Sequence, residues 1–307
     1  MSCLQVIAPG FFTTVQDLGR PGYAHLGVSA CGAADPLSLR LGNMLLGNPQ
    51  SAAALEMTMT GGTFRFPEGA TFALTGFDSK LNGTPIAPWT TTVAHPHTEL
   101  CVGRPQSGAR GYLCIRGGIR VPLVLGSAST HFLSGLGGVN GRALQAGDLL
   151  PIGREPIASP KAALSRRLVI SDNILRTTPG PQTSRFSDET QQTFYHSQYV
   201  VSKQVNRMGL RLQGPELRTL TDAGELSQGV SNGSIQVTNS GQPLILFVEQ
   251  QTTGGYPLIA NIISADLHKV GQLAPGNRVT FERVTIAEAV AFYRQQEAWI
   301  AAGDMFA

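Results

Sequence analysis

Residues 243–263 read PLILFVEQQTTGGYPLIANII. Two apolar runs, at 243–248 and 258–263, flank a polar segment that contains two glycines and a proline. Apolar runs of this length, bounded by glycine and proline, are typical of buried β-strands joined by a turn. The segment 251–257 also carries hydroxyl groups, a carboxamide and a phenol. A tight turn alone explains the glycines and the proline but not these polar side chains, so we favour a turn that binds a small polar ligand.

A weaker copy of this pattern occurs in the first half of the chain. The strand expected at 111–116 is followed by Gly117, Gly118 and Pro122, much as the later strand is followed by its own glycine pair and proline. Two further pairs of segments match in the same order, namely 61–66 with 232–237 and 143–152 with 271–281. Matched features in one order predict two related β-rich domains.

A linker-like segment rich in proline separates the two copies. Residues 151–161 read PIGREPIASPK. Domain boundaries fall in polar segments of this kind, so we predict domains at 1–155 and 156–307. The spacing of strands and turns favours compact barrels or sandwiches over a parallel α/β sheet.

Helices are few and have clear start signals. Asp35 followed by Pro36 predicts one helix start, and Ser187 followed by acidic residues predicts another. Thr285 and Glu288 have the spacing of a capping box, which predicts a helix from there to about residue 300.

The composition is that of a globular protein and limits its partners. Hydrophobic residues make up 42% of the 307 residues, charged residues 14%, and the formal net charge is only +3. A charge this small gives no reason to expect binding to nucleic acid or to a membrane surface. No apolar run approaches the ~18 residues of a membrane span. We therefore expect a cytoplasmic protein.

The chain has four cysteines, and no two of them form a C-x-x-C pair, so we expect reduced thiols and no metal site. Cys31 follows His25 by six residues, and a Cys–His nucleophile is one interpretation. A small buried thiol at the entrance of the first helix is the interpretation we favour.

The chain has neither a phosphate-binding G-x-x-x-x-G-K-[ST] motif nor a G-x-S-x-G elbow. The glycines at 135–141 predict a turn, because the helix required after a dinucleotide motif is missing.

Three charged residues are further candidates for ligand binding. Asp17 and Arg20 lie in TTVQDLGR, and they either bind a ligand or pair with each other at a turn. Arg207 follows the strand expected at 199–205. Its guanidinium either binds a carboxylate or phosphate with two parallel hydrogen bonds or is part of a structural ion pair. A fourth charged residue, Asp266, offers a carboxylate for acid–base work, or it caps a loop.

The order of these motifs resembles a known family, the biotin-dependent carboxyltransferase or allophanate hydrolase subunit 2 family. The resemblance covers about residues 10–284 and is carried by TVQDLGRPG at 14–22, GAAD at 32–35, RGGI at 116–119, NRMG at 206–209 and QTTGGYP at 251–257. Members consist of two cyclophilin-like β-barrel domains. The resemblance therefore implies a mainly β chain of two such barrels with a few short helices.

The resemblance also implies an activity. The family includes the C subunit of ATP-dependent 5-oxoprolinases, which convert the lactam 5-oxoproline to glutamate together with a sister B subunit, similar to KipI, and an A subunit. It implies ATP in the assembly, little activity for this chain alone, and a small lactam or amide substrate. One alternative is the carboxyltransferase part of a biotin-dependent urea or amide carboxylase. A second is a KipA-like regulator, without enzymatic activity, that binds a kinase inhibitor.

The chain has no Met-Lys-Met biotinylation site, so we do not expect biotin on it. A lactam or urea must be polarised at oxygen by hydrogen-bond donors before it reacts. We predict catalytic roles for Arg207, Asp266 and Tyr256. We predict substrate binding by Gln251, Thr252, Thr253, Gly254, Gly255, Asp17 and Arg20.

Overall fold

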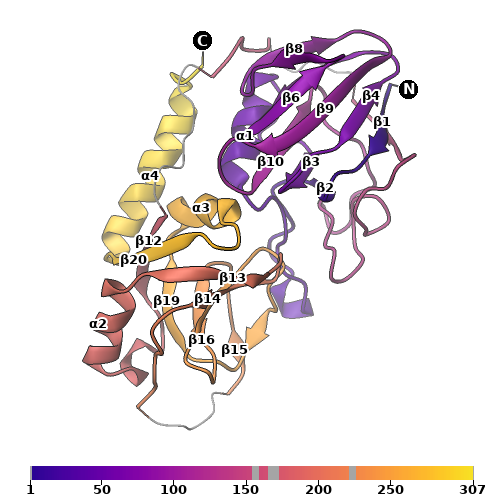
Figure 1. Cartoon of the computed structure of the whole chain (residues 1–307). Coiled ribbons are helices and arrows are strands. Elements are labelled where there is room, and N and C mark those ends of the chain that lie inside the picture. The colour runs from indigo at the N-terminus through magenta and orange to yellow at the C-terminus, as the bar shows by residue number, and fades with distance from the viewer. Residues whose placement is uncertain (1, 154–158, 165–172, 221–225, 307) are drawn as a thin grey trace. The chain divides into compact units, whose positions relative to one another are not determined.

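The structure, a computed structural model, describes residues 2–153, 159–164, 173–220 and 226–306 (Figure 1). The chain forms two compact units. Unit 1 consists of Met1–Arg20, Cys31–Val169 and Gly303–Ala307, and unit 2 of Pro21–Ala30 and Ile170–Ala302. The boundary predicted between residues 155 and 156 lies outside the described residues and stays a prediction.

Unit 1 is built of two antiparallel sheets. The first sheet has six strands, in the order β11 (Leu149–Pro151), β1 (Cys3–Ala8), β4 (Thr63–Phe66), β9 (Thr98–Pro105), β6 (Phe77–Leu81) and β7 (Thr84–Ile86). The second has five, in the order β2 (Phe12–Gln16), β3 (Ala54–Thr58), β10 (Arg110–Ile115), β5 (Ala70–Leu74) and β8 (Thr91–Ala94).

Both sheets of unit 1 contribute to one hydrophobic core. Leu4 and Leu100 come from the first sheet and Leu55 and Leu113 from the second, and all four are fully buried. Alternation explains this arrangement, because successive side chains of a strand point to opposite faces and the apolar set of each sheet then faces inward.

Unit 2 contains a closed barrel of seven strands. Their order is β12 (Ile174–Pro179), β19 (Leu258–Ile262), β16 (Ser234–Val237), β17 (Pro243–Leu246), β14 (Gly209–Gln213), β13 (Tyr199–Val205) and β20 (Arg278–Arg283). Strand β12 runs parallel to β20, and this pairing closes the barrel. A separate ribbon of two short strands is formed by β15 (Gln228–Gly229) and β18 (Thr253–Gly254).

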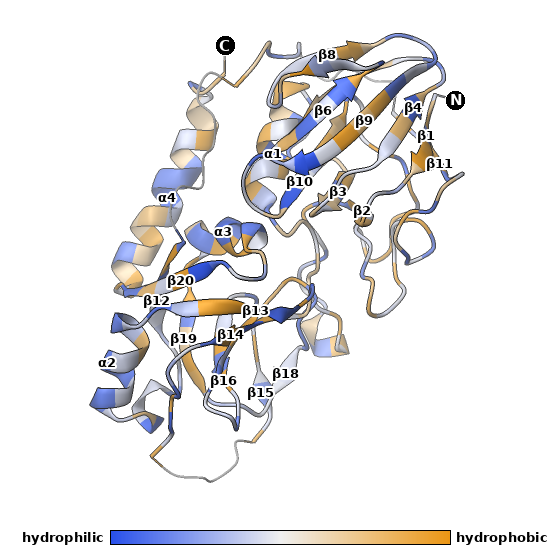
Figure 2. Ribbon diagram, in the orientation of Figure 1, coloured by the Kyte–Doolittle hydropathy of each residue, from blue (hydrophilic) through white to orange (hydrophobic). Residues whose placement is uncertain are grey.

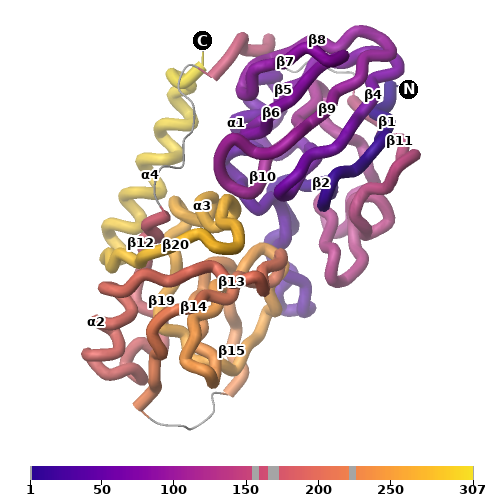
Figure 3. The backbone as a smooth tube through the Cα atoms, in the orientation of Figure 1, coloured from indigo at the N-terminus to yellow at the C-terminus, as the bar shows by residue number. Residues whose placement is uncertain are grey.

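The helices are short, apart from the last one. They are α1 (Pro36–Leu45), α2 (Asp188–His196), α3 (Leu267–Gln272) and α4 (Ile286–Ala302), with 3-10 turns η1 (Ala24–Leu26), η2 (Thr183–Arg185) and η3 (Ser264–Asp266). Helix α1 packs against β10 and β5, while α2 packs against β20. Helix α4 packs against β12 and η3, beside β12 and β20 in Figure 3.

The predicted helix starts are confirmed. Asp35 accepts a hydrogen bond from the Ser38 backbone N–H, and Ser187 caps α2 in the same way. Thr285 and Glu288 form the reciprocal bonds of a capping box, in which each side chain accepts from the other residue's backbone N–H. These local signals were readable because a cap needs only residues close in sequence.

The fold class is also confirmed, since the chain is mainly β with four helices in its described part. The two apolar runs of the opening stretch form β17 and β19, as expected. They are not neighbours in the barrel, because β16 pairs with both and lies between them. The connection from residue 247 to residue 257 therefore passes from one side of β16 to the other.

Candidate active site

The glycine-rich segment 251–257 lies in unit 2 and is anchored on a short ribbon. Thr253 and Gly254 form β18, which pairs with Gly229 and Gln228 of β15. The Val230 backbone N–H donates to the Thr252 carbonyl oxygen at 3.0 Å. The predicted turn therefore has regular backbone pairing in its middle, which limits its freedom.

A buried glutamine holds the segment from the barrel side. Gln236 of β16 is fully buried, and its Nε2 donates to the Tyr256 carbonyl oxygen at 3.2 Å. Its Oε1 accepts from Gln251 Nε2 at 3.4 Å. Gly254 passes so close that a Cβ built on it lies 2.6 Å from Gln236 Nε2. A Cβ at this position would force the Gln236 amide to move, so glycine lets the segment lie directly against that amide.

Side chains of the segment remain accessible above this anchor. Thr253 and Tyr256 are exposed, while Gln251 and Thr252 are partly buried. A row of hydroxyl and amide donors on a fixed backbone suits the polarisation of a carbonyl oxygen, because such donors need little reorganisation. The segment therefore has the chemistry expected of a substrate-binding loop, and that role stays a prediction.

Arg207 lies just before β14 and forms a buried ion pair with Glu249. Its Nε donates to the Glu249 carboxylate, and the Glu249 backbone N–H donates to the Arg207 carbonyl oxygen at 2.8 Å. Both side chains are buried. Removing one charge from such a pair leaves the other buried without compensation, so the pair fixes the chain just before residue 251. A contact between Arg207 and the substrate carboxylate stays a prediction.

Asp266 is fully buried, and its carboxylate binds Arg176 of β12. It accepts from the Arg176 backbone N–H and from Arg176 Nε, both at 2.9 Å. The guanidinium of Arg176 also lies over the ring of Phe292, 3.9 Å from its centre. These contacts anchor the start of α3 and the face of α4. They show a structural task for Asp266, while its acid–base role stays a prediction.

Asp17 and Arg20 belong to unit 1, where both contact the loop at 124–129. Asp17 accepts from the hydroxyls of Ser127 and Ser129, each at 2.6 Å, and from the Ala128 backbone N–H at 2.7 Å. Arg20 donates to the carbonyl oxygens of Val124 and Ser129. Within the described part of unit 1 they do not pair with each other, which removes that alternative. Both are buried, and substrate binding by them stays a prediction.

A second buried polar cluster of unit 1 fixes the start of α1. Glu56 accepts from the Tyr112 hydroxyl and from the Ala34 backbone N–H, both at 2.7 Å. The Asp35 backbone N–H donates to the same hydroxyl at 2.8 Å. Burial, and then the charge of Glu56, raise the pKa of Tyr112 well above its usual value. The phenol is therefore neutral and acts as a structural link.

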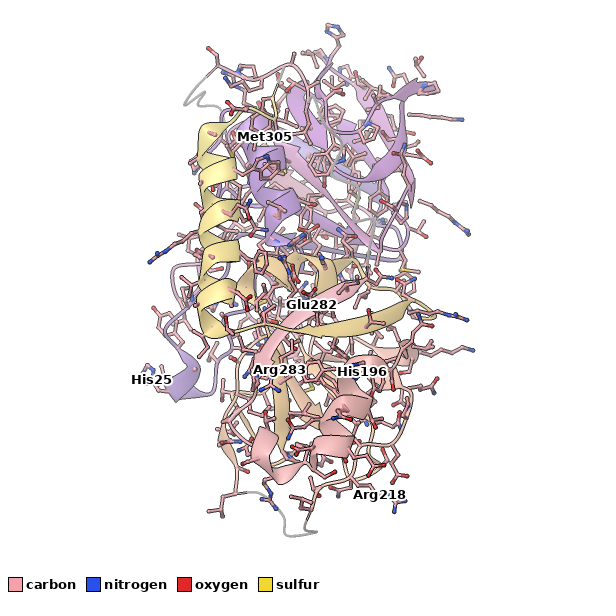
Figure 4. All side chains as sticks on the ribbon, turned by 90° about the vertical axis from the view of Figure 1, so that its left-hand side faces the viewer. His25, His196, Arg218, Glu282, Arg283 and Met305 are labelled. Atoms are coloured by element: carbon pink, nitrogen blue, oxygen red, sulfur yellow. The ribbon has the colours of Figure 1, made fainter. Side chains whose placement is uncertain are left out.

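The favoured interpretation of Cys31 is confirmed. Its thiol is buried and donates to the Thr130 carbonyl oxygen at 3.2 Å. His25 lies on η1, and its imidazole is exposed, pointing away from the ribbon in Figure 4. None of the four cysteines, which all lie in the described part of the chain, forms a disulfide.

The described residues offer neither a metal site nor a membrane span. Across residues 2–153, 159–164, 173–220 and 226–306, no group of three or more His, Cys, Asp or Glu side chains has an arrangement that could hold a metal ion. None of the helices in this part of the chain combines the length and the apolar character needed to cross a membrane.

Three residues that organise this site were not predicted from the sequence. Gln236, Glu249 and Arg176 each hold a predicted residue in place. No local signal marked them, since Gln236 stands at a polar position of the alternating strand expected at 232–237, where a solvent-facing side chain is the usual expectation.

Comparison with known proteins identifies the family. Residues 26–283 match the carboxyltransferase domain, subdomains A and B. The chain belongs to the carboxyltransferase-domain family. Within this family it is 41% identical to the C subunit of 5-oxoprolinase from Escherichia coli, over 96% of this chain and 95% of the relative. It is 36% identical to the C subunit of 5-oxoprolinase from Haemophilus influenzae, over 94% of this chain and 93% of the relative.

A solved structure has the same fold over almost the whole length of this chain. Urea amidolyase of Kluyveromyces lactis superposes with a TM-score of 0.93 at 30% identity. The match covers 99% of this chain and 21% of the urea amidolyase chain. The chain thus spans about a fifth of that longer relative.

Proposed function

We propose that the chain is the C subunit of a 5-oxoprolinase, which opens the lactam of 5-oxoproline to give glutamate. The observation that carries this proposal is the match to two proteins named as this subunit of 5-oxoprolinase, over more than nine tenths of their length. The match to urea amidolyase of Lachancea kluyveri, at 34% identity, covers only 18% of that relative. Correspondence of whole chains favours the oxoprolinase assembly.

The proposal assigns lactam binding to unit 2. The ring carbonyl accepts hydrogen bonds from the accessible donors of Thr252, Thr253 and Tyr256. The substrate carboxylate contacts the guanidinium of Arg207, which Glu249 holds in place. Donors fixed before the substrate arrives stabilise the charge that develops on the lactam oxygen during ring opening.

The proposal includes partner subunits and a nucleotide. Lactam opening coupled to ATP requires a nucleotide-binding site, and this chain has no P-loop motif. We therefore propose that a sister B subunit and an A subunit complete the assembly, and that this chain alone has little activity. A cytoplasmic location remains part of the same proposal.

The test is reconstitution with the two partner subunits. The A and B subunits are purified with this chain, and glutamate release from 5-oxoproline is measured with and without ATP. We expect ATP-dependent release only when all three are present. Release without this chain, or no release from the full mixture, contradicts the proposal.

The second candidate is a carboxyltransferase acting on urea or a related amide. It is favoured by the fold shared with urea amidolyase over 99% of this chain. It predicts carboxylation of urea when a biotin carboxylase and its biotin carrier are supplied, and no effect of 5-oxoproline. A KipA-like regulator would instead give no turnover in either assay and would bind a kinase inhibitor.

A further inference from the structure

A hollow on unit 2 stands apart from the glycine-rich segment. It has a volume of about 530 Å³ and is lined by residues of β13, β14 and the turn between β16 and β17. Volumes of ~300–1,000 Å³ are typical of sites for small molecules. We call it the β13–β14 hollow.

An irregularity in the sheet shapes this hollow. Val201 pairs with Leu212 and Val205 with Leu210, so the three residues 202–204 stand opposite Arg211 alone. Ser202 Oγ accepts from the Gln204 backbone N–H at 3.0 Å, which holds the bulge in place. Bulges redirect side chains and occur next to functional sites more often than elsewhere. In Figure 2 the hydrophobic start of β13 gives way to hydrophilic residues toward its end.

Two cations line the hollow without compensation. Lys203 comes from the bulge and Arg211 from the strand opposite, and both are exposed. In the described part of unit 2, neither side chain has a hydrogen-bond or ion-pair partner. The residues that line the hollow include no aspartate or glutamate. Glu216 lies close to Gly241 beside the rim, and its carboxylate is bound by Arg218 at 3.1 Å.

Neutral polar side chains complete the lining. Gln204, Gln213 and Ser240 are exposed there and can donate hydrogen bonds. Another hollow, in unit 1, differs in charge, since its Arg65 is paired with Glu99 at 3.2 Å. Positive charge that is not neutralised is therefore a feature of the β13–β14 hollow.

We propose that the β13–β14 hollow binds a phosphoryl group through Arg211 and Lys203. A planar guanidinium matches two oxygens of a phosphate, and a flexible ammonium adds the second charge needed for a dianion. The volume greatly exceeds that of one phosphate, so the hollow has room for an organic group attached to it. The ligand class is accordingly a small phosphate ester or free phosphate.

The test measures binding to the full chain rather than activity. Inorganic phosphate and phenyl phosphate are titrated by isothermal calorimetry at constant ionic strength. We expect both to bind, and we expect the double substitution K203A/R211A to weaken binding at least tenfold. Tighter binding of the ester identifies an organic phosphate as ligand, while equal affinities identify free phosphate.

A control variant shows whether loss of a positive charge elsewhere on the surface affects binding. Arg294 on α4 is exposed and does not line the hollow, so R294A removes one positive charge elsewhere on unit 2. It should bind both probes like the wild type. The proposal is overturned if the wild type binds neither probe at ~10 mM, a concentration that would reveal a weak anion site. It is also overturned if K203A/R211A binds the probes as tightly as R294A does. Melting temperatures verify that the variants are folded.

Discussion

The side-chain amide of Gln236 donates a hydrogen bond to the main-chain oxygen of Tyr256 at 3.2 Å. A fully buried strand residue thereby fixes the backbone of an exposed tyrosine on the segment we assign to substrate binding. Gln236 is a positioning residue in this arrangement, because it reaches the substrate only through the segment.

We expect Gln236→Leu to lower turnover strongly while the protein still folds. Loss of the amide leaves the Tyr256 oxygen without its partner, which costs about 1–3 kcal/mol, while leucine still fills the buried space. We expect kcat/KM for 5-oxoproline in the reconstituted assembly to fall at least tenfold, mostly through KM. Gln192→Leu, on the exposed face of α2, is the matched control. Equal kinetics of the two variants would contradict the assignment.

The Arg207–Glu249 pair can be resolved by a double-mutant cycle. Arg207→Met or Glu249→Gln alone should destabilise the protein by about 3–5 kcal/mol, because each leaves one buried group without compensation. The double variant should recover part of this loss in urea denaturation. Glutamate release then separates the two roles of Arg207. Activity that stays at least tenfold low in the double variant supports substrate binding, and restored activity shows a purely structural role.

Tyr256→Phe should lower turnover without changing stability. Tyr256 is 36% exposed and its hydroxyl has no hydrogen-bond partner among the described residues, so removing the hydroxyl breaks no buried hydrogen bond. We expect at least a tenfold loss of kcat/KM and a melting temperature within about 1 °C of the wild type. Tyr293→Phe on α4 is the control, because Tyr293 is also exposed, at 46%. If Tyr256→Phe is as active as this control, the Tyr256 hydroxyl has no role in substrate binding or catalysis.

Acid should destabilise unit 1 partly through Asp148. Arg142 forms two hydrogen bonds to its carboxylate, at 2.8 and 2.7 Å, and lowers the pKa of Asp148 below its usual value. A lowered carboxyl pKa stabilises the folded state above the unfolded pKa of ~3.9, and this contribution is lost as the pH falls through the lower folded value. Melting temperatures of Asp148→Asn should therefore fall less between about pH 5 and pH 2 than those of the wild type. Asp78→Asn, at an exposed site, should follow the wild-type curve.

Thiol labelling should follow burial. Cys101 is exposed, whereas Cys114 is buried and its burial raises the pKa of its thiol far above the usual range. Because the thiolate is the reactive form, iodoacetamide should label Cys101 first and Cys114 only after unfolding. Peptide mapping by mass spectrometry with and without denaturant measures both rates. Equal labelling of the two cysteines in the native protein would show that unit 1 opens more readily than its packing indicates.

Local features were predictable from the sequence. The apolar runs became β17 and β19, and the cap residues Asp35, Ser187 and Thr285 begin their helices. These features depend on neighbours within a few residues, so the sequence contains all the necessary information.

Strand order and the supports of the site could not be predicted in the same way. Strand β16 lies between β17 and β19 because of pairing over long sequence distances, which no local pattern encodes. The partnership of Gln236 with Tyr256 depends on that order. The pairing of Asp266 with Arg176 likewise joins residues 90 positions apart. Such contacts are decided by tertiary packing. From residue type alone, a charged residue could therefore be read either as a ligand-binding residue or as part of a structural contact.

The division of the chain between the units has a practical consequence for anyone who would study them separately. Unit 2 includes Pro21–Ala30 from near the start of the sequence, and unit 1 includes Gly303–Ala307 from its end. A single cut in the gene therefore yields two fragments that each lack a piece of their own unit. Two separately cloned halves would need those ten and five residues exchanged between them before either could be expected to match its unit in the intact protein.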